Sequence, residues 1–132
     1  MARMAASTLV LAAFAAGVAP AQSPGPSPPV GPFTSAQAAR GKLVYEQSCA
    51  ACHGAALEGA AAPSLAGRSF EARWRLPALT LDDLFYIARK TMPPKAAGTL
   101  SLEDHAAVVA YILAANGYAA GTAPLELGAP AS

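Results

Sequence analysis

The chain has 132 residues, nine basic and eight acidic side chains, and a formal net charge of +1 at pH 7. Because this charge is small and the sequence has no basic stripe, we expect neither nucleic acid nor an anionic membrane surface as a partner. Hydrophobic residues make up 54% of the chain. Much of that fraction comes from alanine and from the first 21 residues, so the composition indicates one small soluble domain.

Residues 1–21 have the pattern of a signal peptide. Arg3 and the free amino terminus supply positive charge, residues 5–18 form an apolar run, and the tripeptide APA at 19–21 offers small residues for cleavage after Ala21. The run has about 14 residues, fewer than the roughly 20 needed to span a bilayer. We therefore predict a periplasmic protein with no stable membrane insertion after cleavage.

Both ends of the remaining chain have the composition of connecting segments. Residues 22–32, QSPGPSPPVGP, are rich in proline, glycine and serine and predict a linker with extended polyproline II character. Residues 122–132 show no periodicity and contain Pro124 and Pro130, which predicts a flexible tail. The sequence thus places one domain at residues 33–121.

Three sites in this domain carry the signal of a helix start, in which a Ser or Thr is followed three residues later by Gln or Asp. The pairs are Thr34 with Gln37, Thr80 with Asp83, and Ser101 with Asp104. Apolar residues follow each pair at helical spacing, and no comparable stretch alternates with period two. The sequence therefore predicts an all-α domain.

The expected helices end at recognisable signals. The first reaches Cys49, the second stops before Pro93-Pro94, and the third is capped by Asn116-Gly117. Long loops are then expected at residues 54–79 and 92–100. Since a domain of this size buries limited apolar surface, such loops are costly unless they pack on a large cofactor. We accordingly expect the protein to fold poorly without one.

The pentapeptide Cys49-Ala50-Ala51-Cys52-His53 identifies that cofactor as a c-type haem. Each thiol can add to one haem vinyl group, and the adjacent imidazole can bind the iron. A disulfide, a redox-active dithiol or half of a zinc site are the competing interpretations. The chain has no other cysteine and no second ligand cluster. One haem c, held through Cys49 and Cys52, is therefore the predicted cofactor.

Met92 is the predicted second axial ligand, opposite His53. It is the one methionine left after removal of residues 1–21, and it lies in a short segment followed by two prolines that stiffen the backbone. A thioether is a soft, neutral ligand that raises the reduction potential relative to a second imidazole. The competing interpretation is a methionine that fills a gap in the core.

His105 is the alternative iron ligand. It falls in the first turns of the last expected helix, beside Glu103 and Asp104. Such surroundings are typical of a solvated helix face, so a surface position is expected instead.

The arrangement resembles the class I cytochromes c over residues 39–121. The resemblance rests on a helix with Gly41 and Tyr45 before the CAACHG segment, on APSLAG at 62–67, on TMPP at 91–94 and on YIL at 111–113. It implies that Gly41 and Tyr111 mark the crossing of the terminal helices. It also implies that the Pro63 carbonyl accepts a hydrogen bond from His53.

Trp74 has two possible roles in this resemblance. With Arg73 or Arg75 it could contact the edge of the haem or a propionate, or it could be a core residue with the arginines solvated. Residues 111–121, YILAANGYAAG, are also similar to small periplasmic cytochromes that serve dehydrogenases.

A six-coordinate iron with no acid or base set beside it implies an electron carrier and not an enzyme. The expected donor is a periplasmic dehydrogenase, and the expected acceptor is an oxidase or another cytochrome. The alanines at 60–62 and 96–97 are candidates for a small apolar docking face. One alternative is a cytochrome subunit bound permanently in a dehydrogenase complex. A ligand-binding protein or peroxidase with an open axial site is the other.

Overall fold

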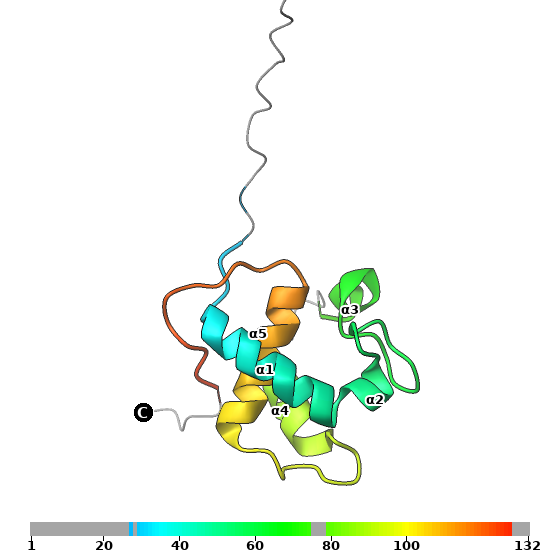
Figure 1. Ribbon diagram of the computed structural model, residues 1–132. Coiled ribbons are helices and arrows are strands. Elements are labelled where there is room, and N and C mark those ends of the chain that lie inside the picture. The colour runs from blue at the N-terminus through cyan, green and yellow to red at the C-terminus, as the bar shows by residue number, and fades with distance from the viewer. Residues whose placement is uncertain (1–26, 28, 75–78, 128–132) are drawn as a thin grey trace, which may run out of the picture.

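The computed structural model describes residues 27, 29–74 and 79–127, and within them it is helical (Figure 1). The helices are α1 (Ser35–Ser48), α2 (Ala50–His53), α3 (Gly67–Trp74), α4 (Leu81–Thr91) and α5 (Leu102–Ala115). The part of the chain that is described contains no strand, only one isolated bridge between Val30 and Ala119. The expected all-α fold is confirmed. The predicted signal peptide lies outside the described residues.

Local side-chain bonds start three of the helices where the sequence predicts. The hydroxyls of Thr34, Thr80 and Ser101 each accept a hydrogen bond from the backbone N–H three residues later. At α4 the box is complete, because the Asp83 carboxylate also accepts from the backbone N–H of Thr80 at 2.7 Å. These bonds lower the pKa of Asp83 below its usual range.

The main packing contact is the crossing of α1 with α5 at Gly41 (Figure 1). A Cβ atom at residue 41 would lie 1.8 Å from the backbone carbonyl oxygen of Ala107 and 3.0 Å from Cβ of Tyr111. Only glycine therefore permits this approach. At the rim of the crossing Arg40 forms ion pairs with Glu103 and Asp104.

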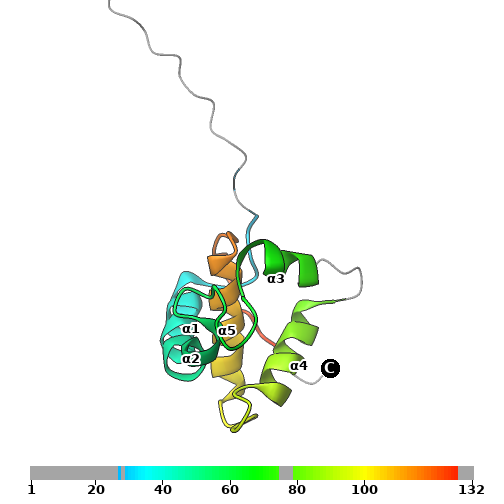
Figure 2. The ribbon, with the colours of Figure 1, turned by 90° about the vertical axis from the view of Figure 1, so that its right-hand side faces the viewer.

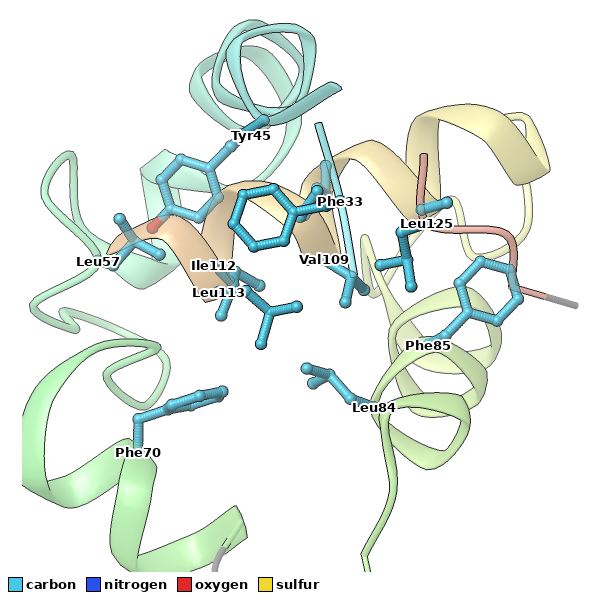
Figure 3. Packing of buried hydrophobic residues seen from close by; sticks show 14 residues of the cluster. Phe33, Tyr45, Leu57, Phe70, Leu84, Phe85, Val109, Ile112, Leu113 and Leu125 are labelled. Atoms are coloured by element: carbon cyan, nitrogen blue, oxygen red, sulfur yellow. The ribbon is translucent and has the colours of Figure 1, made fainter. Parts of the chain in front are cut away.

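Helix α5 supplies more of the core than any other element. Val109, Ile112 and Leu113 pack against residues from the other segments, and Figure 3 shows the side chains of Phe70 and Leu84 reaching toward them from α3 and α4. In Figure 2, α1 and α2 lie on one side of α5 and α4 lies on the other. The apolar face of α5 is thus covered from two directions.

The loop expected at 54–79 contains a helix, α3, so that prediction is wrong for residues 67–74. Asn116 holds the start of α3. Its Oδ1 accepts from the backbone N–H of Gly67 at 2.9 Å, and its Nδ2 donates to the Leu65 carbonyl at 2.9 Å. Because this support comes from the end of α5, a local pattern could not reveal it.

His105 is buried, with 3% of its surface exposed, so the predicted surface position is wrong. Nδ1 lies 3.0 Å from the Ser101 carbonyl oxygen, and the ring meets Phe85 edge-on at 6.1 Å. His105 shares a helix face with Val109 and Ile112, at spacings of four and three, and that face is the core face of α5. Among the described residues, Nε2 has no hydrogen-bond partner.

Residues 122–127, part of the expected tail, pack against the domain. Leu125 is 7% exposed and belongs to the core. The Gln37 side chain binds its backbone twice: Nε2 donates to the Leu125 carbonyl at 2.8 Å, and Oε1 accepts from the Leu125 N–H at 2.7 Å. The Gln37 side chain therefore binds Leu125 and does not accept a hydrogen bond from the backbone N–H of Thr34, as it would in a capping box.

The end of the expected linker also pairs with the domain. The backbone N–H of Gly31 donates to the Ala119 carbonyl at 2.7 Å, and that of Ala119 donates to the Pro29 carbonyl at 2.8 Å. The N–H of Gly121 donates to the Phe33 carbonyl at 2.7 Å. Residues 29–33 therefore run beside residues 119–121.

Gly41→Ala tests the helix crossing. In an ordinary helix position this change raises stability by about 1 kcal/mol. Here we expect it to lower the free energy of unfolding of the haem-loaded protein by about 2 kcal/mol, because the backbone of Ala107 has no room for the methyl group. Denaturant titration followed by circular dichroism measures this. Ala39→Gly, exposed on the same helix, controls for helix propensity. A stabilising Gly41→Ala would contradict the close approach.

Leu125→Ala tests the packing of residues 122–127. We expect a loss of about 2 kcal/mol or more in unfolding free energy, as for other buried leucines. The exposed neighbour Glu126 provides the control, because Glu126→Ala should change stability by no more than about 0.5 kcal/mol. If the two variants have equal stability, Leu125 is not part of the core.

Candidate haem site

The motif of two cysteines and a histidine lies at the junction of α1 and α2. α1 ends at Ser48, Cys49 caps it, and α2 continues as a single turn from Ala50 to His53. Gly54 then turns the chain with φ = +86°, a backbone conformation that favours glycine. Both cysteines and His53 are thus presented on less than two turns of backbone.

The two thiols are free, and they differ in exposure. Cys49 is partly buried and Cys52 is exposed. Burial raises the pKa of the Cys49 thiol above its usual value. Among the described residues, no group of three or more His, Cys, Asp and Glu side chains is arranged to hold a metal ion.

His53 is oriented by a backbone carbonyl. Its ring is buried, and Nδ1 lies 2.7 Å from the carbonyl oxygen of Pro63. Because a carbonyl can only accept, Nδ1 carries the proton in this contact, which leaves the lone pair on Nε2. A neutral imidazole with a free Nε2 is the form that binds a metal. The contact has the geometry that the family resemblance implies for Pro63.

The loop after the motif is bonded back onto it. The backbone N–H of Gly59 donates to the His53 carbonyl at 2.7 Å, and that of Ala62 donates to the Cys52 carbonyl at 2.9 Å. Gly59 has φ = +87°, and a Cβ atom there would lie 2.8 Å from the backbone nitrogen of Ser64. These bonds fix the position from which Pro63 reaches His53.

Tyr45 contributes a contact that the sequence did not reveal. Its hydroxyl donates to the Gly54 carbonyl at 2.6 Å, and the side chain is fully buried. Burial raises the pKa of the phenol to about 12. The two residues are nine positions apart, and no local signal marks such a pair.

Met92 lies on a different element from the motif. It caps the end of α4, is partly buried, and donates its backbone N–H to the Ala88 carbonyl at 2.9 Å. Since α2 and α4 lie on opposite sides of α5, the motif and Met92 are supplied from two sides of the domain (Figure 2).

Trp74 lines a pocket of about 510 Å³ between α3, the start of α4 and the end of α5. Its ring is 5.9 Å from that of Phe70, and Leu81, Leu84 and Leu113 complete the apolar wall. The motif residues and Met92 do not line this pocket. Arg73 is exposed, and Arg75 lies outside the described residues.

The residues fit a covalently held porphyrin. Two free thiols and an imidazole with an available Nε2 are the donor set for haem c. No helix within the described residues has the length and hydropathy needed to cross a membrane.

Comparison with known proteins agrees with this fit. The family model described as cytochrome C oxidase, cbb3-type, subunit III matches residues 36–112. No curated protein sequence is significantly similar to the chain.

Two solved structures are similar. The sulfane dehydrogenase SoxCD from Paracoccus pantotrophus has 28% identity and a TM-score of 0.48, over 67% of this chain and 51% of its own. Cytochrome cL from Hyphomicrobium denitrificans has 27% identity and a TM-score of 0.47, over 62% and 50%. The chain thus matches about half the length of each.

The family match covers more than half of the chain and runs from the first turn of α1 to Ile112 in α5. It includes Cys49, Cys52 and His53, the residues with the chemistry for haem attachment. The chain therefore belongs to the family of cytochrome c oxidase, cbb3-type, subunit III, and is a class I c-type cytochrome, an electron-transfer protein with an all-α cytochrome c fold and a covalently bound haem c.

Proposed function

We propose that this cytochrome is a periplasmic carrier of single electrons with His53 and Met92 as the axial ligands of its haem. The contact between His53 Nδ1 and the Pro63 carbonyl carries the proposal, because it leaves Nε2 as the available donor atom. When bound, the haem supplies a one-electron redox couple. Cys49 and Cys52 hold it through thioether bonds.

Met92 decides between a carrier and a ligand-binding protein. As a soft, neutral donor opposite an imidazole, its sulfur would stabilise ferrous iron and occupy the position that a substrate would need. Its place at the end of α4, with two prolines after it, limits the freedom of the backbone that presents the sulfur. A peroxidase or gas-binding protein would require this position to be open.

The periplasmic location rests on residues 1–21 and on the chemistry of the site. The amino-terminal segment has a charged start, an apolar run and small residues before Gln22. Export places the chain on the oxidising side of the membrane, where the cell handles thiols destined for haem.

The proposed donor is a periplasmic dehydrogenase, and the acceptor is an oxidase or another cytochrome. The resemblance of residues 111–121 to small cytochromes that serve dehydrogenases supports the choice of donor. A permanent subunit of a dehydrogenase complex would use the same chemistry. Concentration-dependent electron exchange distinguishes a free carrier from a subunit that co-purifies with its partner.

The proposed docking face combines the alanines of the two ligand-bearing segments. Ala60, Ala61, Ala96 and Ala97 are all exposed. The segment 84–101 has three basic side chains, Arg89, Lys90 and Lys95, and no acidic one. This short segment around Met92 in the sequence is therefore positive although the whole chain is close to neutral, which favours an acidic region on the partner.

Met92→Ala tests the axial ligand. We expect the wild-type ferric protein to show the weak long-wavelength band of thioether-to-iron coordination and the ferrous protein to bind carbon monoxide poorly. The variant should lose the band, bind carbon monoxide readily and have a lower reduction potential, because the soft sulfur ligand is gone. Absorption spectra in both oxidation states and a redox titration measure all three.

His105→Leu is the matched control, since it removes the other candidate ligand without touching Met92. If Met92 is the ligand, its spectra should equal those of the wild type; loss of the band in this variant would identify His105, whose Nδ1 contacts the Ser101 carbonyl and leaves Nε2 without a partner among the described residues. A wild-type protein that lacks the band and binds carbon monoxide would show an open site and favour ligand binding or catalysis.

Ala97→Glu tests the docking face with a small oxidant. Oxidation of the ferrous protein by hexacyanoferrate(III) should slow roughly threefold at low salt. The reason is that a carboxylate on the face where the electron leaves the protein repels the anionic oxidant. The stopped-flow rate should recover in high salt. Ala39→Glu places the same charge on the exposed side of α1 and should leave the rate unchanged. Equal oxidation rates in the two variants would show that electrons do not leave the protein through this face, and would contradict the proposal.

A further inference from the structure

Tyr45 contacts both ends of the haem-attachment motif. Its backbone carbonyl accepts a hydrogen bond from the N–H of Cys49 at 2.8 Å, and its hydroxyl donates to the carbonyl of Gly54 at 2.6 Å. These partners are the first residue of the pentapeptide and the residue that follows its last. The first bond is the ordinary backbone bond of a helix, and the second is made by the side chain. Tyr45 is thus bonded at each end of residues 49–53.

The position of the Tyr45 ring is fixed by the crossing of α1 with α5. The side chain has no exposed surface, and its ring lies 5.3 Å from that of Tyr111 on α5. Gly41, one turn earlier, lies directly against the backbone of α5. A hydroxyl on a ring held this way has little freedom to follow its acceptor.

The acceptor end is also constrained. The Gly54 carbonyl takes a second hydrogen bond from the N–H of Leu57 at 3.2 Å, and Gly54 has φ = +86°. Burial raises the pKa of the Tyr45 phenol to about 12, so the group remains a donor at neutral pH. Gly54 follows His53 directly, so movement of its peptide would turn the backbone that carries the imidazole.

We propose that Tyr45 is a positioning residue for His53, whose hydroxyl transmits the geometry of the α1–α5 crossing to the imidazole through the Gly54 carbonyl. The inference depends on the proposed role of His53 as an axial ligand. Pro63 fixes the imidazole at Nδ1, and Tyr45 fixes the backbone behind it. The orientation of the ring is then determined from two independent segments of the chain.

A purely structural role is the competing explanation. A buried tyrosine hydroxyl needs a hydrogen-bond partner in any fold, and Gly54 could simply be the nearest acceptor. Loss of the hydroxyl would then lower stability and leave the haem environment unchanged. The two explanations differ in what the haem spectrum reports.

Tyr45→Phe in the haem-loaded protein is the test, because it keeps the ring and removes only the donor. Tyr111→Phe is the matched control, since Tyr111 is the ring partner and its hydroxyl does not contact Gly54. Two measurements are made on each variant. The first is the proton shift pattern of the haem methyl groups in the ferric protein, which depends on the direction of the imidazole plane. The second is amide hydrogen exchange at Leu57.

We expect Tyr45→Phe to change the haem methyl pattern and to accelerate exchange at Leu57 by roughly two- to tenfold, the range for loss of one hydrogen bond. Tyr111→Phe should change neither. If Tyr45→Phe leaves the haem methyl pattern equal to that of Tyr111→Phe, the inference is overturned, whatever the exchange rate at Leu57, because a purely structural bond would also affect that amide.

A second substitution covers the case in which Tyr45→Phe does not mature. Site-specific 3-fluorotyrosine at position 45 keeps the bond but strengthens the donor, so it should displace the methyl pattern, and an unchanged pattern would overturn the inference. Failure of the proposed axial ligation is seen separately, in the wild-type ferric spectrum. Failure of the present inference leaves that spectrum intact.

Discussion

Because residue 41 has no side chain, the backbone of α1 lies directly against the carbonyl of Ala107 in α5. The contacts that surround the motif begin at this crossing. One turn on, Tyr45 packs against Tyr111 and reaches the Gly54 carbonyl. The motif between them is thereby held at the end of α1, and the loop that returns to it brings the Pro63 carbonyl to His53. In the proposal made above, the helix crossing thereby contributes to the orientation of His53.

We expect the haem to supply apolar surface that the small polypeptide core lacks, although neither the motif residues nor Met92 line the pocket described above. Apolar residues from α3, α4 and α5 line a pocket of about 510 Å³, and Phe70, Leu84 and Leu113 direct their side chains toward it (Figure 3). A domain this small gains much of its stability from such a large apolar partner.

Features governed by short-range bonds could be predicted from the sequence, and those set by tertiary contacts could not. The starts of α1, α4 and α5 follow from hydroxyls that bond three residues ahead. By contrast, α3 depends on Asn116, and Gln37 binds Leu125, 88 residues away. The burial of His105 is not predictable from its neighbours, because Glu103 and Asp104 are typical of a surface and the ring is covered by residues distant in sequence, such as Phe85. Residues 49–53 identify the cofactor, whereas the ligation of Met92 remains a prediction, since the sulfur comes from a separate helix.

The most direct test of the proposed ligation is the chemical shift of the Met92 methyl protons in the ferrous protein. It is read from a carbon–proton correlation spectrum after the methionine methyl group has been labelled with carbon-13. If residues 1–21 are removed as proposed, Met92 is the one methionine left and a single signal is expected. If the sulfur binds the iron, the methyl group lies over the porphyrin, and its proton signal must be displaced far upfield by the ring current. A signal at the ordinary methionine position would show that Met92 is not a ligand and would contradict the proposed electron carrier.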